Sequence, residues 1–150
     1  MTGRIVVGVD GSEPSRAALR WAADEARLRG ATLEAVLAWQ MPFVGDIPLP
    51  PIGDLERAAM ATLEKVLADE GCADDTLTTV VSIVSEGASA PVLLDAAIDA
   101  DLLVLGSRGR GAFRGMLLGS VSQHCVTHAN CPVVVVRTND APSDPSLTKS

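Results

Sequence analysis

Short apolar runs that alternate with helix-like segments constrain the fold of this chain more than any other feature of its sequence. The runs are rich in Val, Ile and Leu, and they span residues 4–10, 32–38, 77–84, 102–105 and 133–136. Strands that are apolar on both faces are typical of parallel sheets that helices cover on both sides. The alternating order predicts an α/β fold: a single five-stranded parallel sheet with helices on both faces and right-handed crossovers, which is a Rossmann-like arrangement.

Residue types that begin and end helices mark the four segments between these runs. Ser12 is suited to cap the first helix, and Gly30 is suited to end it. Similar signals place the other helices from Asp54 to Gly71, from Ser89 onward and from Ser120 to about Ala129. Residues 40–53 contain four prolines and two glycines, so we expect a long connection there.

The length and the ends of the chain indicate one domain with a short tail. The 150 residues suit a single domain, which we expect to cover residues 1–137, and the tail 138–150 is rich in Pro, Ser, Asp and Thr and is expected to be disordered. No apolar run approaches the ~18 residues of a membrane span, and the N-terminus does not follow the pattern of an export signal. We therefore expect a cytoplasmic protein without membrane contact. Its three cysteines suit free thiols in a reducing compartment.

The charge distribution sets one segment apart from the rest. The formal net charge of −7 argues against nucleic acid as a general partner, because phosphate backbones need a basic surface. Of the 19 acidic residues, 17 lie between Asp10 and Asp101, and the other two are Asp140 and Asp144. Residues 102–139 contain no acid and hold Arg108, Arg110, Arg114 and Arg137. The segment has the charge that an anion site requires, although a solvated loop with a chance bias would show the same counts.

A glycine-rich stretch follows the fourth predicted strand. In open parallel sheets ligands bind at the carboxyl ends of the strands where the winding reverses, and strands one and four are expected to flank that point. The spacing is Gly106, two residues, Gly109, nine residues, Gly119 and then Ser120. Missing side chains let the backbone approach a ligand, and free N–H groups at residues 120–122 would face a polyphosphate. Neither the common P-loop pattern nor a dinucleotide fingerprint after strand one occurs in the sequence.

The spacing Gly106-x2-Gly109-x9-Gly119-Ser120 resembles the ATP-binding signature of the universal stress protein family. Similar features are the Val-Gly-Val-Asp-Gly-Ser opening, the Gly-Ser-Arg-Gly turn, the Gly-Ser-Val-Ser helix start and Cys-Pro-Val-Val-Val-Val near the end, which together cover about residues 4–137. The resemblance implies an adenine nucleotide alpha hydrolase-like fold that binds ATP, with any need for Mg²⁺ and the choice among ATP, ADP and AMP left open. It also implies a homodimer through the Val133–Val136 strand, unless the monomer shields that edge.

The same resemblance assigns a role to each residue of the predicted site. In ATP-binding members the end of strand one and a strand-two backbone group hold adenine, while the glycine loop holds ribose and phosphates. The implied adenine contacts are Gly8, Val9, Asp10 and Ala38. The implied ribose and phosphate contacts are Leu105, Gly106, Arg108, Gly109, Gly119, Ser120, Val121 and Ser122. The chain departs from many members at Leu37, where they have His. A similar fold whose pocket is empty or holds another anion is the alternative.

Other reactive side chains do not combine into a site. His124 and His128 lie four residues apart, but Cys125 would point about 100° away from His124 and Cys131 lies beyond the helix, so we expect no metal site. No catalytic Ser-His-Asp or Cys-His set can be assigned, and no lysine lies near the glycine loop to clamp phosphates. We expect Asp10 to orient a ligand and any ATP hydrolysis to be slow.

Three functions from different classes fit these observations. The first is a regulatory or stress-response protein in which ATP acts as a conformational switch toward an unknown protein partner. It rests on an anion cradle that lacks a catalytic set. The second is an ATP hydrolase or a phosphoryl or adenylyl transferase, and the third is an interaction module that binds no nucleotide.

Overall fold

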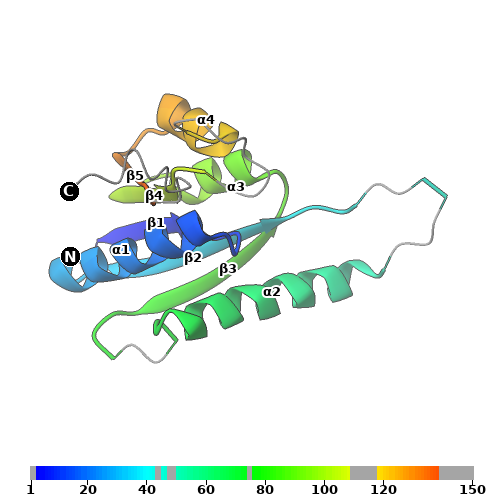
Figure 1. Cartoon of the computed structure of the whole chain (residues 1–150), viewed down its shortest axis with the longest axis horizontal. Helices are drawn as coiled ribbons and strands as arrows, with labels where there is room; N and C mark the ends of the chain where they lie inside the picture. Colours follow the sequence, from blue (N-terminus) through cyan, green and yellow to red (C-terminus); the bar gives the residue numbers. More distant parts are fainter. Residues whose placement is uncertain (1–2, 43–44, 47–49, 74–75, 109–117, 139–150) are drawn as a thin grey trace, which may run out of the picture.

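Strands and helices alternate along the part of the chain that the computed structural model describes, which is residues 3–42, 45–46, 50–73, 76–108 and 118–138. In chain order the elements are β1 (Arg4–Gly8), α1 (Glu13–Arg29), β2 (Thr32–Trp39), α2 (Ile52–Asp69), β3 (Val80–Glu86), α3 (Ser89–Ala96), β4 (Leu102–Gly106), α4 (Ser120–His128) and β5 (Val133–Val136). All paired strands are parallel, in the order β3-β2-β1-β4-β5 (Figure 1). The predicted five-stranded α/β fold is confirmed, with β1 in the middle and β4 beside it.

The side chains of β1 alternate between two separate hydrophobic clusters. Ile5 and Val7 pack with α1 and α2 in one cluster, and Val6 packs with α3 and α4 in the other. In β4, Leu102 and Val104 join the first cluster. Each of these five side chains is at most 3% exposed. The central strands are therefore buried on both faces, as their unbroken apolar sequences predict.

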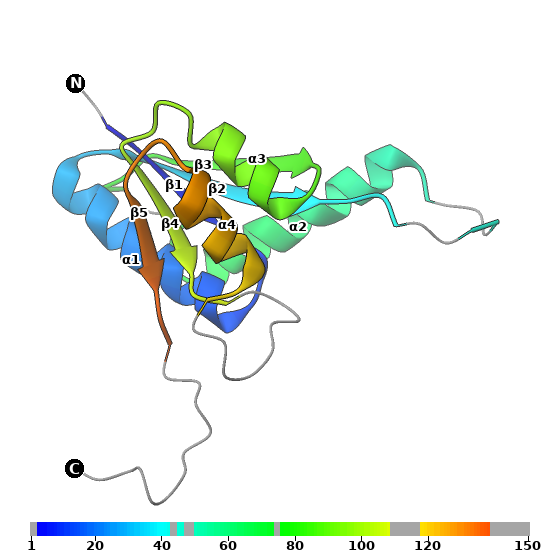
Figure 2. The same ribbon diagram turned by 90° about the horizontal axis from the view of Figure 1, so that it is seen from above.

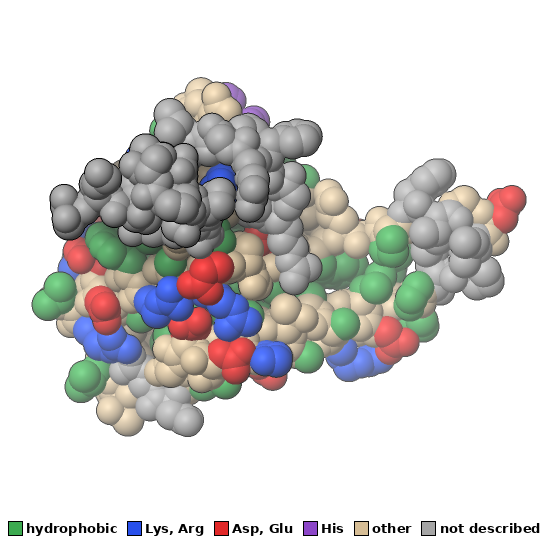
Figure 3. Space-filling view, in the orientation of Figure 1, with side chains coloured by type: hydrophobic (Ala, Val, Ile, Leu, Met, Phe, Trp, Pro, Cys, Tyr) green, Lys and Arg blue, Asp and Glu red, His purple; other side chains and the backbone are tan. Residues whose placement is uncertain are grey.

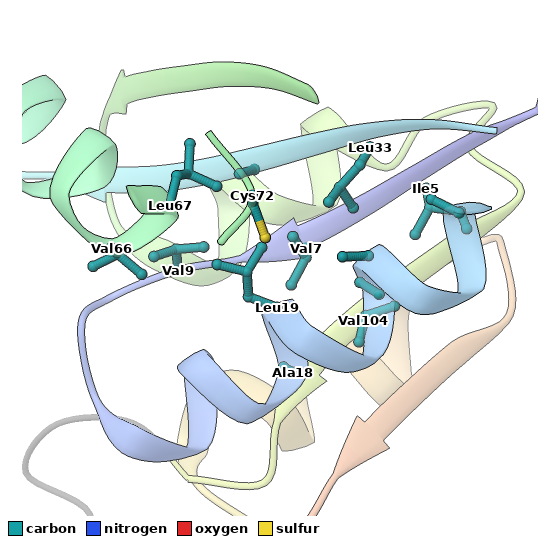
Figure 4. Close-up of a cluster of buried hydrophobic side chains, with 14 of the residues drawn as sticks. Ile5, Val7, Val9, Ala18, Leu19, Leu33, Val66, Leu67, Cys72 and Val104 are labelled. Atoms are coloured by element: carbon teal, nitrogen blue, oxygen red, sulfur yellow. The ribbon is translucent and has the colours of Figure 1, made fainter. Parts of the chain in front are cut away.

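The helices form two layers, with α1 and α2 on one face of the sheet and α3 and α4 on the other (Figures 1 and 2). The cluster under α1 and α2 is the larger one, and Figure 4 shows Leu19 of α1 and Val7 of β1 next to the sulfur of Cys72. Burying one such aliphatic side chain contributes roughly 1.5–3 kcal/mol to folding. This layer therefore supplies much of the hydrophobic stabilisation that fixes the carboxyl ends of the strands.

Both ends of α1 lie where the sequence predicts them. Ser12 has an extended backbone, and its side chain accepts a hydrogen bond from the amide of Ser15 at 3.4 Å. Gly30 has a φ of 65°, and its amide bonds back to the carbonyls of Ala26 and Arg27. An added Cβ at Gly30 would meet nothing within 4 Å, so the left-handed backbone angle, not crowding, favours glycine there.

The other helices begin earlier than their predicted caps. The sequence placed capping side chains at Asp54, Ser89 and Ser120, and the structure places all three within the first helical turn. An N-cap needs mainly a non-helical backbone whose carbonyl accepts the first helical bond, so residues without a polar side chain can occupy it. The observed N-cap residues are Pro51, Ala88 and Gly119, and none of them makes a side-chain capping bond.

The third strand also differs from its prediction. The sequence predicted residues 77–84, whereas β3 spans Val80–Glu86. Its register with β2 begins at the pair Leu33 and Val80, and Leu77 is 76% exposed. Thr and Leu at 77–79 give the same local signal as a strand, and the carbonyl of Thr79 still accepts a hydrogen bond from the amide of Leu33 at 2.9 Å. Residues 77 and 78, however, lie beyond the first residue of β2, Thr32, in this register. The length of the neighbouring strand decides where β3 begins.

Two expectations from the sequence concern the ends and the surface of the chain. Within the described residues, no helix has the combined length and hydropathy of a bilayer span. Residues 139–150 of the predicted tail lie outside the described residues, so the expected disorder stays a prediction.

The core under α2 can be tested with a pair of leucines. Leu63 is fully buried, whereas Leu28 on α1 is 83% exposed. Leu63→Ala should lower the free energy of unfolding by about 2–5 kcal/mol, because it removes buried methyl groups and leaves a cavity. Leu28→Ala, which deletes the same atoms in water, should change it by less than ~0.5 kcal/mol. Urea unfolding followed by circular dichroism measures both; equal effects would contradict the arrangement of α2 on the sheet.

Candidate functional site

A cleft opens at the carboxyl ends of the central strands. It contains about 460 Å³ of empty space and is open to solvent. Residues of β1, β2 and β4 form its floor, and the first turns of α1, α3 and α4 border it. The chain continues from β1 to β2 on one side, while β4 pairs with the other side of β1. The cleft therefore lies at the point where the winding reverses, which is where the sequence predicts a ligand site.

Most of the residues predicted from the sequence come together at this cleft. Gly119 and Ser120 form the start of α4 next to Val121, without lining the cleft themselves. Gly109 lies outside the described residues. Contact between any of these residues and a ligand stays a prediction. The predicted residues that line the cleft are Gly8, Val9, Asp10, Ala38, Leu105, Gly106, Arg108, Val121 and Ser122.

Four further residues line the cleft that were not predicted as site residues from the sequence: Ser15, Val36, Ser89 and Leu93. Ser89 was expected to cap α3, but it is the first helical residue and its side chain borders the cleft instead. Helices α1 and α3 both start at the carboxyl ends of strands, so the residues of their first turns belong near any ligand at that edge. The order of strands and helices predicted from the sequence already contained this information, so Ser15 and Ser89 could have been predicted as residues near the cleft.

Gly8 makes the floor of the cleft compact. A Cβ on Gly8 would lie 2.9 Å from Cδ1 of Leu93 and 3.1 Å from Cδ2 of Leu105. Leu93 of α3 thus packs directly on the end of β1, which leaves no room for a side chain. The floor between Val36 and Leu93 is consequently apolar at the end of the central strand.

Gly106 allows the first turn of α1 to approach the end of β4. A Cβ on Gly106 would lie 2.6 Å from the carbonyl carbon and 2.7 Å from the carbonyl oxygen of Pro14. Backbone atoms cannot move aside as a flexible side chain does, so any side chain here would displace α1 or β4. The sequence suggested that Gly106 brings the chain close to a ligand; the structure adds helix packing as a second reason for the glycine.

The turn between β1 and α1 is held by its own polar groups. Oδ1 of Asp10 accepts hydrogen bonds from the amide of Ser12 at 2.9 Å and from its hydroxyl at 2.5 Å. The hydroxyl of Ser15 accepts from the amide of Asp10 at 3.2 Å and donates to the carbonyl of Ser12 at 3.0 Å. The Asp10 carboxylate is therefore fixed at the rim of the cleft by short local bonds.

The start of α4 is tied to the end of β4 by two hydrogen bonds. The amide of Gly119 donates to the carbonyl of Ser107 at 2.7 Å, and the hydroxyl of Ser122 donates to the carbonyl of Gly106 at 2.5 Å. The first helical bond runs from the amide of Gln123 to Gly119. The hydrogen bonds found among the described residues leave the amides of residues 120–122 without a partner. These amides and the helix dipole give the α4 start a local positive potential.

Few charged or reactive side chains lie at the cleft or on α4 in the described part of the chain. Asp10 and Arg108 are the charged side chains among the described residues that line it. On α4, Cys125 is buried on the face toward the sheet, while His124 and His128 are exposed and their rings lie 4.3 Å apart. Burial raises the pKa of the Cys125 thiol, so the thiol stays protonated and inert. The described residues contain no cluster of three or more His, Cys, Asp or Glu side chains with metal-binding geometry.

A second hollow adjoins the cleft on the side of α2. It contains about 740 Å³ of open space, and Asp10 and Ala38 line both hollows. Leu37 lines only this second hollow, together with Leu55 of α2, and it packs with the α1 and α2 cluster. The residue at which the chain departs from many ATP-binding members thus faces away from the floor of the first cleft.

Comparison with known proteins gives the sequence family. The model of the Universal stress protein family matches residues 1–137. Universal stress protein Rv2623 of Mycobacterium tuberculosis (strain ATCC 25618 / H37Rv) is 37% identical over 145 residues, which cover 91% of this chain and 48% of the relative. The chain spans about half the length of the curated relatives it matches.

Solved structures give the same result for the fold. Universal stress protein UspA from Lactobacillus plantarum superposes with a TM-score of 0.77 at 26% identity, covering 90% of this chain and 97% of that protein. A universal stress protein in complex with cAMP superposes with a TM-score of 0.58 at 28% identity, covering 89% of this chain and 95% of that protein. Because the family model matches nearly its whole length, the chain belongs to the universal stress protein family.

Proposed function

We propose that this domain binds an adenine nucleotide in the cleft, with ATP as the expected ligand. The observation that carries the proposal is the unpaired first turn of α4, where Val121 and Ser122 line the cleft together with Arg108. Free amides at a helix start and a guanidinium are groups that bind phosphate. The complex of a related universal stress protein with cAMP supports an adenine nucleotide as the class of ligand.

The two ends of the cleft suit the two ends of a nucleotide. Val36, Ala38 and Leu93 line it with apolar surface above the compact backbone of Gly8, which suits a flat base. The phosphates would then extend toward Arg108 and the start of α4. In this arrangement the predicted adenine contacts on β1 and β2 and the predicted phosphate contacts on β4 and α4 act on one ligand.

The cleft supports binding better than catalysis. The Asp10 carboxylate accepts two hydrogen bonds from Ser12, so it serves as a fixed acceptor or as a ligand for Mg²⁺ that accompanies ATP. Among the described residues that line the cleft, none is a His, Lys or Cys that would act as base or nucleophile. We therefore propose slow hydrolysis at most.

We further propose that the nucleotide acts as a conformational switch toward a protein partner. The cleft is lined from the β1 turn, from the end of β4 and from the first turn of α4, so one ligand would join elements that are far apart in the sequence. A ligand shifts a conformational equilibrium only by its difference in affinity for the two states. A nucleotide that contacts several elements at once would bind more tightly to the state in which these elements lie close together, which gives such a difference in affinity.

We also propose that the protein forms a homodimer through β5. Within the described part of the chain β5 is an edge strand, and its four valines are only half-buried. The carbonyl of Pro132 accepts a hydrogen bond from Leu103 of β4, and that of Val136 accepts one from Ser107, the residue after β4. Because main-chain groups alternate in direction along a strand, those of Val135 point to the open side, where a second copy can pair.

The nucleotide proposal predicts that the purified protein carries or binds a nucleotide and that removing the positive charge of Arg108 weakens this binding. Heat-denatured protein should release an adenine nucleotide, and calorimetry on nucleotide-free protein should show ATP binding with and without Mg²⁺.

Arg108→Gln should weaken ATP binding about tenfold, since a hydrogen bond to a charged group contributes about 1.5 kcal/mol. Adenosine, which lacks phosphates, should bind both proteins with a similar Kd.

Arg29→Gln is the matched control for this experiment. Arg29 lies in the last turn of α1 and pairs with Glu25 at 2.7 Å, so its loss changes the net charge equally but at the opposite end of the sheet. ATP affinity should be unchanged in this variant. Equal losses in both variants would mean that net charge alone acts, and a protein that releases no nucleotide and binds no ATP would rule out the proposal in favour of an interaction module.

The dimer proposal predicts that an outward main-chain donor on β5 is needed. Val135→Pro removes the N–H that points to the open side and keeps the bonds to β4, so light scattering after size exclusion should show a monomer. Val135→Thr keeps both the N–H and a β-branched side chain and should remain a dimer. A wild-type protein that elutes as a monomer at micromolar concentration would refute the proposal.

A further inference from the structure

A chain of ion pairs connects α1 with the end of α2. Arg20 bonds to Glu13 on its own helix at 2.9 Å and to Glu70, the residue after α2, at 2.7 Å. Arg16 lies one helical turn earlier, 3.6 Å from Glu70 and 3.3 Å from Asp69. Acidic and basic side chains intermingle on this face of the molecule in Figure 3. Two carboxylates at the end of α2 thus hold the guanidinium of Arg16.

Arg16 makes one more contact, and this contact leads to the cleft. Its Nε donates a hydrogen bond to the carbonyl of Gly11 at 3.3 Å. Gly11 follows Asp10 in the β1–α1 turn and has a φ of 83°, a left-handed conformation that favours glycine. The side chain of Arg16 is only 22% exposed, so its path between α1, α2 and this turn is largely enclosed by protein.

Gly11 lies between Asp10 and Ser12, the residue whose hydrogen bonds fix the Asp10 carboxylate. Oδ1 of Asp10 accepts hydrogen bonds from the amide and from the hydroxyl of Ser12, on the other side of Gly11. Ser12 is also the N-cap of α1, so its backbone is tied to the helix. A rotation of the Gly11 peptide would move the Ser12 amide away from Asp10 and weaken the hold of Ser12 on the carboxylate at the rim of the cleft.

We propose that Arg16 is a positioning residue of the nucleotide site: anchored by Asp69 and Glu70 at the end of α2, it holds the Gly11 carbonyl and thereby the turn that presents Asp10 to the ligand. This inference rests on the proposed nucleotide binding. Arg16 does not line the cleft and acts through the turn. Through Arg16, the end of α2 helps to hold the β1–α1 turn in place at the cleft.

The geometry requires arginine at this position. A guanidinium has separate donors, so Nε bonds to Gly11 while Nη1 faces the carboxylates. Lysine has a single ammonium and cannot reproduce this fork. The pKa of Asp69 is lowered because its carboxylate accepts hydrogen bonds from Lys65 and from Arg16. Asp69 therefore stays ionised over the whole neutral range and keeps the anchor charged.

The first test uses the nucleotide-free protein. Amide hydrogen exchange by NMR should show the Ser12 amide exchanging about three- to tenfold faster in Arg16→Gln and in Arg16→Lys than in wild type, as expected for the loss of one modest hydrogen bond. Arg20→Gln is the matched control, because Arg20 shares Glu70 but bonds to no main-chain group of the turn in the described structure. It should leave Ser12 unchanged. Unchanged exchange in Arg16→Gln would overturn the inference, whether or not the protein binds nucleotide.

The second test separates positioning from general stability. Arg16→Gln should weaken ATP binding about three- to tenfold in the wild-type background and by less than about twofold when Asp10→Ala is already present, because the two residues act through one turn. Arg20→Gln should leave ATP affinity unchanged while lowering thermal stability comparably. Equal losses in both Asp10 backgrounds, or an equal loss in Arg20→Gln, would overturn the inference. If wild type binds no nucleotide, the proposed function fails, and the exchange experiment still decides whether Arg16 holds the turn.

Discussion

Burial of the sheet on both faces is the constraint on which the rest of this structure depends. Because helices cover both sides, the ends of the strands are the places where main-chain groups of the sheet can meet a ligand. The covering helices pack so closely there that Gly8 and Gly106 have no room for a side chain beside Leu93 and Pro14. Core packing therefore fixes the ends of β1 and β4 at the cleft.

The start of α4 separates the groups that anchor it from the groups that remain available. The Gly119 amide and the Ser122 hydroxyl bind carbonyls at the end of β4. The amides of residues 120–122 take no part in that anchoring. A helix end without a capping side chain would ordinarily be a weakness, since unpaired amides are costly away from water. At the edge of an open cleft, water could satisfy the same amides, and in the proposed function an anion would replace that water.

Local signals in the sequence predicted much of the fold and most of the residues that line the cleft. Ser12 and Gly30 bound α1 as predicted, since capping and left-handed glycine depend on neighbours in the chain. The predicted start of β3 was wrong because it depends on where β2 begins, and β2 lies far earlier in the chain. Ser89 was misassigned because local sequence cannot tell a cap from a first-turn residue that faces a cleft. Ser15 was missed because its place in the first turn of the helix after β1 was not used as a signal. The contacts of Arg16 join segments more than fifty residues apart, as the Arg16–Asp69 pair shows.

The acidic excess of the protein and an anion site are compatible because the charges are separated in space. At physiological ionic strength fields decay over about 8 Å, so a net charge of −7 matters less to a bound phosphate than the donors in contact with it. The arginines of α1 pair with carboxylates of α1 and of the end of α2, including Glu70 directly after it, as Arg16 and Arg20 show. Arg108 instead belongs to the acid-free segment and lines the cleft. Acids thus hold structural arginines in place, while the segment that would bind phosphate contains no acid of its own, and Asp10 of the β1–α1 turn is the carboxylate among the described residues that line the cleft.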